Sequence, residues 1–354
     1  MDRFVKRREK VKKKIKELNL DAYLVLHPAN RFYLSGFELK DPQCNESAGC
    51  ILILPDKEDY LLTDPRYFET AQKLWDKNYL FIYTSNKEEE IKKFLIKNKL
   101  KDIGFEPNIM TYEFYKSLSE SVNLHPYKGL IESLREIKDE DEINFIKESV
   151  KINHKVFDRL NSMELIGVTE EELAWEIEKL FRDFGATEMA FNPIVAYGKN
   201  AAEPHYTPGK IKVQKNGCLL IDIGGRYKDY CSDQTRTFWI GDKVPDYFSR
   251  VLDLVISAQR LAIENLKVGM RIKDLFFLVK DFFNENGVGD NFTHALGHGI
   301  GLETHEAPAL GSRNNKTFKP GMVVTIEPGL YFPEWGGVRW EHMVVVTEEG
   351  AKVL

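Results

Sequence analysis

Acidic residues inside apolar, strand-like runs constrain this sequence more than any other feature. Asp222 lies within "LLIDIGG", Glu327 within "VVTIEPG" and Glu341 within "VRWEHMVVV". An ionised carboxylate buried without a partner is very costly, so each side chain needs a hydrogen-bond donor, a proton or a cation. One such residue alone would be explained by a structural ion pair or by the end of a strand. Three of them in one half of the chain favour a shared polar site.

The segment "LLIDIGGRYKDYCSDQTRT" (residues 219–237) has two apolar runs around a glycine-bearing turn, a pattern typical of a β-hairpin. With the turn centred between Tyr227 and Lys228, Asp222 is expected directly opposite Asp233. Like charges in directly opposed positions destabilise a strand pair. The pairing therefore predicts a positive charge between the two carboxylates.

The segment "THALGHGIGLETHE" supplies His294, His298 and His305 to the same half of the chain. A single histidine in such a loop is more often structural than a ligand, but the glycines around His298 permit close approach of the backbone. One imidazole with four carboxylates suits Mn²⁺, Co²⁺ or Zn²⁺. Two divalent ions would balance the four negative charges, and such a pair lowers the pKa of a shared water molecule to about 7.

Composition excludes several classes of protein. The 354 residues are 43% hydrophobic and 30% charged, which is typical of a globular chain long enough for two domains. No apolar run of membrane-spanning length and no secretory h-region is evident, so we expect a cytoplasmic protein without membrane association. The basic start, residues 1–20, has the pattern of an amphipathic helix, and the net charge of −5 argues against nucleic-acid binding.

The order of predicted elements indicates two domains, at residues 1–126 and 127–354. In the first, strands at 22–27, 49–55, 60–64 and 80–85 alternate with helices at 65–75, 87–99 and 111–121, which predicts an α/β domain. The second begins with a long charged helix from residue 129. It continues with a helix capped by Thr169 and Glu172, helices near 246–266 and 272–286, and strand-rich ends. This order favours an α+β domain around an antiparallel sheet.

The four cysteines show neither the close spacing of a zinc site nor a dense disulfide pattern. We expect them to be buried free thiols, with metal chelation as the alternative. They are Cys44, Cys50, Cys218 and Cys231.

The acidic residues and the histidine stand in an order that resembles a known family. The candidate metal ligands are Asp222, Asp233, His298, Glu327 and Glu341, in the contexts "DIGG", "SDQTRT", "GHGIG", "EPG" and "VRWE". This pattern resembles the pita-bread metallopeptidases, which include Xaa-Pro dipeptidases (prolidases), Xaa-Pro aminopeptidases and methionine aminopeptidases. In the N-terminal half, "NRFYLSGF" and "TDPRYFE" resemble the creatinase-type domain of the proline-specific members, which methionine aminopeptidases generally lack.

The resemblance implies a creatinase-type α/β domain followed by an α+β pita-bread domain with a curved antiparallel sheet. It also implies roles for individual residues, each of which has a purely structural alternative. Glu327 would shuttle a proton, His305 would stabilise the oxyanion, and His205 would border the substrate. Substrate-binding roles are implied for His294, Tyr331 and Arg339. Thr235 would support Asp233.

The function implied is cleavage of the Xaa-Pro bond by a hydroxide bridging two divalent ions, Mn, Co or Zn, in a homodimer. The substrate would be a peptide with proline at the second position. Because Ala309 stands where some dipeptide-specialised relatives carry arginine, an aminopeptidase is favoured over a dipeptidase, unless Arg313 substitutes. His342 replaces the acid usual after the last ligand. The alternatives are a metal-free creatinase-like amidinohydrolase and a non-catalytic pita-bread binding module.

Overall fold

The computed structural model describes residues 3–41, 43 and 46–354. The chain divides into two units, Met1–Leu134 and Arg135–Leu354. The domain boundary expected between residues 126 and 127 lies a few residues before this division and stays a prediction.

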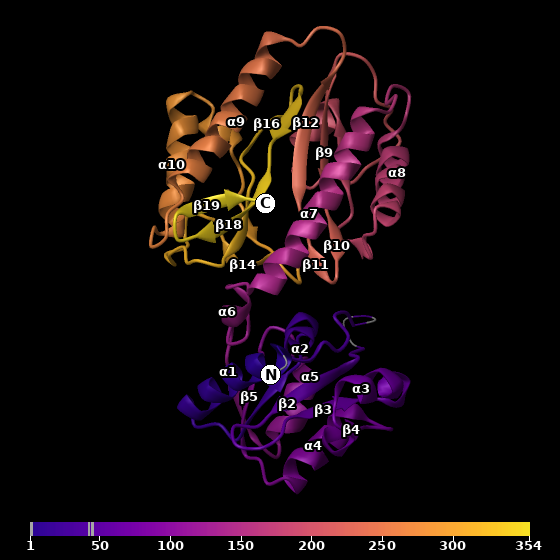
Figure 1. Cartoon of the computed structure of the whole chain (residues 1–354), viewed down its shortest axis with the longest axis vertical. Coiled ribbons are helices and arrows are strands. Elements are labelled where there is room, and N and C mark those ends of the chain that lie inside the picture. Colours follow the sequence, from indigo (N-terminus) through magenta and orange to yellow (C-terminus); the bar gives the residue numbers. More distant parts are fainter. Residues whose placement is uncertain (1–2, 42, 44–45) are drawn as a thin grey trace. The chain divides into compact units, whose positions relative to one another are not determined.

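The first unit contains a six-stranded sheet in the order β4-β3-β2-β1-β5-β6 (Figure 1). Its strands are β1 (Ala22–Val25), β2 (Gly49–Ile53), β3 (Tyr60–Thr63), β4 (Leu80–Ile82), β5 (Asp102–Phe105) and β6 (Asn123–Pro126). The sheet is mixed, because β1 pairs antiparallel with β2 and parallel with β5. The first four strands were predicted, whereas the last two contain glycine, asparagine or proline, which are depleted in strands, and were missed.

The described part of the first unit holds five complete α-helices, three of which begin at a side-chain cap or at proline. They are α1 (Arg3–Glu17), α2 (Pro28–Ser35), α3 (Phe68–Leu74), α4 (Lys87–Lys97) and α5 (Tyr112–Ser119). Asn86 caps α4 and Thr111 caps α5 through their side-chain oxygens. The amphipathic pattern of α1 is confirmed, since Val11 and Ile15 are buried. The sequence did not predict α2, which starts with proline and ends at Gly36 with a φ of 74°.

The charged stretch from residue 129 forms two helices rather than the single one expected. These are α6 (Glu132–Arg135) and α7 (Glu140–Asn161). The break occurs because Asp139 and Glu142 form a capping box that starts a new helix. The remaining helices match their predictions, including the capping box of Thr169 and Glu172, and they are α8 (Glu170–Asp183), α9 (Asp246–Asn265) and α10 (Ile272–Glu285).

The strands of the second unit form several small sheets, and every pairing among its described strands is antiparallel. Three sheets have the orders β11-β10-β7, β12-β9-β8 and β14-β13-β15-β18-β19, and β16 pairs with β17. The bounds are β7 (Glu188–Met189), β8 (Ile194–Tyr197), β9 (Gly217–Ile223), β10 (Gly225–Tyr227), β11 (Tyr230–Cys231), β12 (Gln234–Ile240), β13 (His298–Gly299), β14 (Glu306–Ala309), β15 (Val323–Ile326), β16 (Gly329–Phe332), β17 (Gly336–Arg339), β18 (His342–Thr347) and β19 (Gly350–Val353).

The predicted register of the hairpin at residues 219–237 is wrong. Asp222 on β9 pairs with Thr235 on β12, not with Asp233. The turn is formed by Lys228 and Asp229, whose φ angles of 46° and 74° give the left-handed conformation of a two-residue hairpin turn. The centre of the turn is one residue later than expected, so each residue of one strand pairs with a residue two positions further along the other. Because side chains alternate with a period of two, every side chain still lies on the face of the sheet that was predicted for it.

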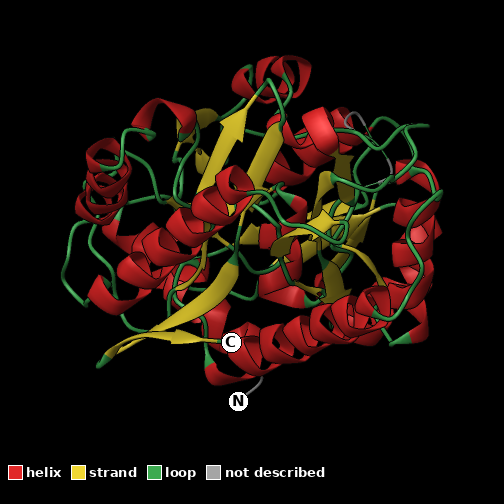
Figure 2. Ribbon diagram, turned by 90° about the horizontal axis from the view of Figure 1, so that it is seen from above, coloured by secondary structure: helices red, strands yellow, loops and turns green. Residues whose placement is uncertain are grey.

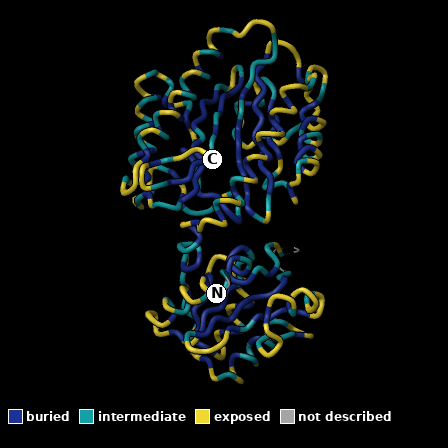
Figure 3. The backbone as a smooth tube through the Cα atoms, viewed as in Figure 1, coloured by how far each residue is buried: buried dark blue, intermediate teal, exposed yellow. Residues whose placement is uncertain are grey.

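Residues of β9 alternate between two apolar cores. Leu219 and Ile221 pack with α7 and α8, whereas Cys218 and Leu220 pack with α9 and α10. Figure 1 shows these helix pairs on opposite sides of the β9–β12 ladder. Figure 2, seen from above, shows helices running beside the strands, and Figure 3 shows β9 as buried chain. By this alternation, Asp222 points to the side of Leu220, where β15–β18 also lie.

The described cysteines confirm the expectation of buried free thiols. They are Cys50, Cys218 and Cys231, and Cys44 lies outside the described residues. Burial raises the pKa of the Cys218 and Cys231 thiols to about 11, so both are protonated at neutral pH. Among the described helices, none is both long and apolar enough to cross a bilayer.

Candidate active site

Five chain segments bring the candidate metal ligands together in the second unit. Asp222 lies on β9, Asp233 between β11 and β12, His298 on β13, Glu327 after β15, and Glu341 between β17 and β18. The His298 Nε2 atom lies 3.5 Å from Asp233 Oδ2 and 3.4 Å from Glu327 Oε1. Asp233, His298 and Glu341 each offer an atom within 4.8 Å of the others, close enough to share one metal ion.

Three of the four carboxylates have a buried oxygen that accepts no hydrogen bond from the described residues. These oxygens are Asp222 Oδ1, Asp233 Oδ1 and Glu341 Oε1. A buried acceptor without a donor is costly, and buried charges are normally paired or coordinate a metal. Oxygen and imidazole ligands in this combination suit a divalent ion such as Mn²⁺, Co²⁺ or Zn²⁺. The donor set therefore fits a bound cation.

The electrostatics of the cluster lead to the same conclusion. Burial raises the pKa of Asp233 well above its usual range, and the nearby charges of Glu341 and Asp222 raise it further. The pKa of Glu341 is also raised, by burial and then by Glu327 and Asp222. Burial raises the pKa of Glu327 to about 8, although Arg339 opposes the shift. Burial lowers the pKa of His298 to about 4, which leaves the imidazole neutral and available as a ligand.

The backbone around His298 can approach its neighbours only because glycines flank it. A Cβ at Gly297 would lie 2.0 Å from the Thr325 carbonyl oxygen, and one at Gly299 would lie 2.3 Å from that of Ala307. The backbone N–H of His298 donates to Thr325 Oγ1 at 3.0 Å, and this hydroxyl donates to Glu327 Oε1 at 3.2 Å. Thr325 therefore links two of the candidate ligands.

Arg339 and Thr235 orient the carboxylates of Asp222 and Glu341 through hydrogen bonds. The Arg339 guanidinium donates to Asp222 Oδ2 at 2.7 Å and to Thr235 Oγ1 at 3.0 Å. The Thr235 hydroxyl, which we expected beside Asp233, donates to Glu341 Oε2 at 2.8 Å. Hydrogen bonds of this kind fix the direction of a ligand's remaining lone pairs.

A second hydrogen-bonded chain runs from Arg339 through Tyr331 to His294. Arg339 Nη1 donates to the Tyr331 hydroxyl at 2.8 Å, so the phenolic proton is directed to His294 Nε2, 2.9 Å away. Burial lowers the pKa of His294 to about 4, consistent with a neutral ring that accepts this proton. The His294 Nδ1 then donates to the carbonyl of Ala295 at 2.7 Å.

A cavity of about 580 Å³ opens onto the carboxylates. His205, His294 and His305 line it, together with Asp222, Asp233, His298, Glu327, Ala309 and Arg339. The His305 ring meets the His298 ring edge to face, with their centroids 4.3 Å apart. The structure thus brings all three pocket histidines predicted from the sequence to one cavity.

Glu170 organises the segment that carries His205, a role that could not be predicted from the sequence. Its fully buried carboxylate accepts hydrogen bonds from Tyr197 N at 2.7 Å, Tyr206 Oη at 2.8 Å and Gly209 N at 3.1 Å. In "TEEE", Glu170 is indistinguishable from the two acids after it, because all three suit the first turn of a helix.

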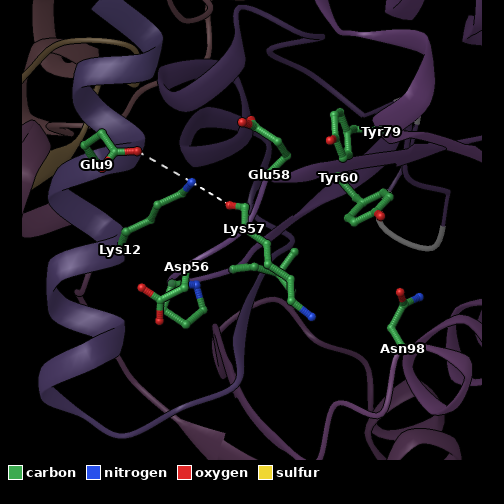
Figure 4. Close-up of a pocket in the computed structure, with 10 residues that line it drawn as sticks. Glu9, Lys12, Asp56, Lys57, Glu58, Tyr60, Tyr79 and Asn98 are labelled. Atoms are coloured by element: carbon green, nitrogen blue, oxygen red, sulfur yellow. Dashed lines mark hydrogen bonds and ion pairs between the residues drawn. The ribbon is translucent and has the colours of Figure 1, made fainter.

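A cavity of about 560 Å³ in the first unit lacks these features (Figure 4). Lys12 is directed between the carboxylate of Glu9, at 3.5 Å, and the backbone carbonyl of Lys57, at 2.8 Å. None of the described lining side chains has a buried polar atom without a partner. Lys12 is thus paired within this cavity, and the described lining side chains leave no buried polar atom that calls for a ligand.

Comparison with family models defines the class to which this fold and site belong. Residues 144–348 match the model of metallopeptidase family M24, and residues 7–137 match the creatinase/prolidase N-terminal domain. The chain therefore belongs to metallopeptidase family M24. This confirms the predicted family, the two-domain fold and the expectation of a hydrolase.

Individual relatives extend over almost the whole chain. "Uncharacterized peptidase YqhT" of Bacillus subtilis (strain 168) is 35% identical over 354 residues, covering 98% of this chain and 96% of that protein. The solved Xaa-Pro dipeptidase from Bacillus anthracis has a TM-score of 0.91 and 33% identity, covering 99% of this chain and 97% of that one. The X-Pro aminopeptidase from Thermotoga maritima MSB8 has a TM-score of 0.88 and 32% identity, covering 98% and 96%.

Proposed function

We propose that this protein hydrolyses the peptide bond that precedes proline, using two divalent metal ions, Mn, Co or Zn. The three buried carboxylate oxygens without hydrogen-bond partners carry this proposal. Asp222, Asp233, His298, Glu327 and Glu341 would hold the ions. When bound, the ions would lower the pKa of a water molecule and polarise the scissile carbonyl.

The chain's own residues would then direct the proton and the substrate. Glu327 would accept a proton and deliver it to the departing proline nitrogen. His305 lines the cavity beside His298 and would donate to the developing oxyanion. His205 and His294 would border the substrate, with His294 held by Tyr331.

The cavity lining favours an aminopeptidase over a dipeptidase. A dipeptide places a free carboxylate directly on the proline, which a cation would recognise. Among the described lining residues, the only arginine or lysine is Arg339, and it is already bonded to Asp222, Thr235 and Tyr331. Ala309 offers no charge, and Arg313 does not line the cavity. Longer Xaa-Pro peptides have no carboxylate at this position and therefore suit the lining better.

The experiment is to compare hydrolysis of an Xaa-Pro dipeptide, an Xaa-Pro-Yaa tripeptide and an Xaa-Ala-Yaa control, with Mn²⁺ or Co²⁺ added after chelation. We expect the tripeptide to have the highest kcat/KM and the alanine peptide the lowest. A higher kcat/KM for the dipeptide would reverse the assignment to an aminopeptidase. Absence of bound metal and of hydrolysis would instead favour an amidinohydrolase or a binding module. A homodimer and a cytoplasmic location stay predictions.

A further inference from the structure

Arg236, His342 and Gln259 form a hydrogen-bonded row beside the candidate ligands, and nothing in the proposed function uses it. Arg236 Nη2 lies 2.8 Å from His342 Nε2, and His342 Nδ1 lies 3.0 Å from Gln259 Oε1. The Gln259 side-chain nitrogen donates to the carbonyl oxygens of Ile326 at 3.0 Å and Trp340 at 3.1 Å. Gln259 itself is almost fully buried.

The chemistry of these groups fixes the direction of every hydrogen bond. A guanidinium can only donate, so His342 Nε2 must accept from Arg236. The proton of the neutral ring is then on Nδ1, which donates to Gln259 Oε1. The oxygen of Gln259 is thereby held toward His342, and its amide nitrogen is directed to the two backbone carbonyls. Reversing any member of the row would set two donors or two acceptors against each other.

The row ends on the two peptide groups that position the glutamates. Ile326 immediately precedes Glu327, and Trp340 immediately precedes Glu341. Arg236 adds two further hydrogen bonds, from Nη1 to the carbonyl oxygens of Glu341 at 2.6 Å and Thr235 at 2.8 Å. The peptide groups on both sides of the Glu341 Cα are therefore held by side chains of this row.

Packing holds the cationic end of the row in place. The Arg236 guanidinium lies over the Trp340 ring, 4.5 Å from its centroid, and 5.9 Å from that of Phe157. An arginine held against aromatic faces loses little further freedom when it donates to fixed carbonyls. The row is consequently a rigid connection between α9, β12 and the start of β18.

We propose that His342 and Gln259 are positioning residues that fix the backbone of Glu327 and Glu341 for metal binding. The proposal rests on the proposed function, because it assigns the two glutamates as ligands. An ionised carboxylate at position 342 could accept from Arg236 but could not donate to Gln259. The Gln259 oxygen would lose its donor, so its amide would no longer be held toward both carbonyls. His342 and Gln259 are thus matched to each other in this chain.

The first test is the substitution Gln259→Met, which keeps the length and burial of the side chain but removes both hydrogen bonds to the carbonyls. We expect Mn²⁺ to bind about 10–100-fold more weakly to the chelator-stripped variant, as for other residues that orient metal ligands. The measurement is calorimetric titration with Mn²⁺ alone, and kcat should fall with little change in KM. The matched control is Asn265→Leu on the same helix, because among the described residues Asn265 donates only to the Leu261 carbonyl of α9.

Two substitutions of His342 separate the halves of the row and remain informative if Gln259→Met does not fold. His342→Asn retains a donor near the Nδ1 position, toward Gln259, whereas His342→Gln retains an acceptor near the Nε2 position, toward Arg236. We expect His342→Asn to bind Mn²⁺ more tightly than His342→Gln. Equal affinity of all folded variants and the wild type would overturn the proposal. A wild-type protein that binds no Mn²⁺ would instead overturn the proposed function.

Discussion

The second unit contains two buried clusters of charge that are built in opposite ways. In the carboxylate cluster, Asp222, Asp233, Glu327 and Glu341 face one another, and Arg339 bonds only to Asp222 among them. The Arg135 cluster consists of Arg135, Lys138, Glu303 and Glu306. Here Lys138 Nζ lies 2.6 Å from Glu306 Oε1, and Arg135 bonds to Glu306 Oε2 and, at 2.8 Å, to Glu303.

The two clusters differ in the protonation of otherwise similar side chains. Burial alone would raise the pKa of Glu306, but Arg135 and Lys138 hold it below its usual range. For Glu327, burial prevails and its pKa rises to about 8. In the Arg135 cluster the chain supplies its own cations to Glu306. Because Glu306 directly follows the pocket residue His305, we interpret this cluster as a structural support for that segment. Where the chain supplies too few cations, a ligand must provide the remaining positive charge.

The largest effect on stability should come from removing the arginine of the Arg135 cluster. Arg135→Met leaves Glu303 and Glu306 without this partner, and breaking a buried ion pair typically costs about 3–5 kcal/mol. We expect the free energy of unfolding of the second unit, measured in urea, to fall by about this amount. Adding Glu306→Gln to the variant should restore part of the loss. If the free energy of unfolding fell by less than is typical for breaking an exposed ion pair, the Arg135 cluster would have no structural task.

Adding a cation to the carboxylate cluster should have the next largest effect. At a Mn²⁺ concentration about 100 times its dissociation constant, binding to the native state alone stabilises a protein by about 2.7 kcal/mol. We expect a matching rise in Tm for the chelator-stripped protein, reversed by fresh chelator. The Asp233→Asn variant should show a much smaller rise in Tm, because it lacks one of the carboxylates that we expect to hold the ion. The same response in both proteins would place the bound ion elsewhere.

Without metal, Asp233→Asn should stabilise the protein even though it abolishes hydrolysis. The substitution replaces a carboxyl group whose pKa is raised by burial and by neighbouring carboxylates, and relieving such strain at a functional site favours the folded state. The comparison variant is Glu306→Gln, which removes an attracted carboxylate and should destabilise. The check is the unfolding midpoint of both variants in chelator. Shifts of the same sign would remove the distinction between the clusters.

The smallest effect expected is the pH dependence of the metal-free protein, since water entering the open cavity screens the groups as they ionise. The folded state keeps a proton on Glu327 up to pH about 8, whereas an unfolded glutamate loses it near pH about 4.5. Between these values the native state binds more protons, so stability should fall as pH rises. Glu306 acts in the opposite sense, because its stabilisation is lost as pH falls through its lowered pKa. Thermal unfolding at pH 5 and 8 in chelator, repeated with Mn²⁺, tests the difference.

The comparison also shows what the sequence could reveal. A carboxylate inside an apolar run is visible in the sequence, so Asp222, Glu327 and Glu341 could be proposed as candidate ligands without a structure. The register of the hairpin could not be predicted correctly. Lys228 and Asp229 adopt the left-handed conformation, which in hairpin turns is usually adopted by glycine or asparagine. The displacement by two residues nevertheless preserved the face of Asp222.

Residues that act through distant partners escaped prediction for a different reason. Gln259 on α9 bonds to carbonyls 67 and 81 positions away, and Arg135 bonds to Glu306 171 positions away. In the sequence, each has the local pattern of an ordinary polar residue of a helix. Only the packing of the second unit gives them their partners.

The distribution of the five candidate ligands over five separate segments of the chain has a consequence for how the protein matures. A short metal-binding loop can capture an ion early and fold around it, as zinc fingers do. Here Asp222 and Glu341 meet only after the intervening helices and strands have formed, and contacts of such long sequence separation are slow to form. Metal capture should therefore be a late event, so that uptake of Mn²⁺ during refolding reports the time at which the second unit is complete.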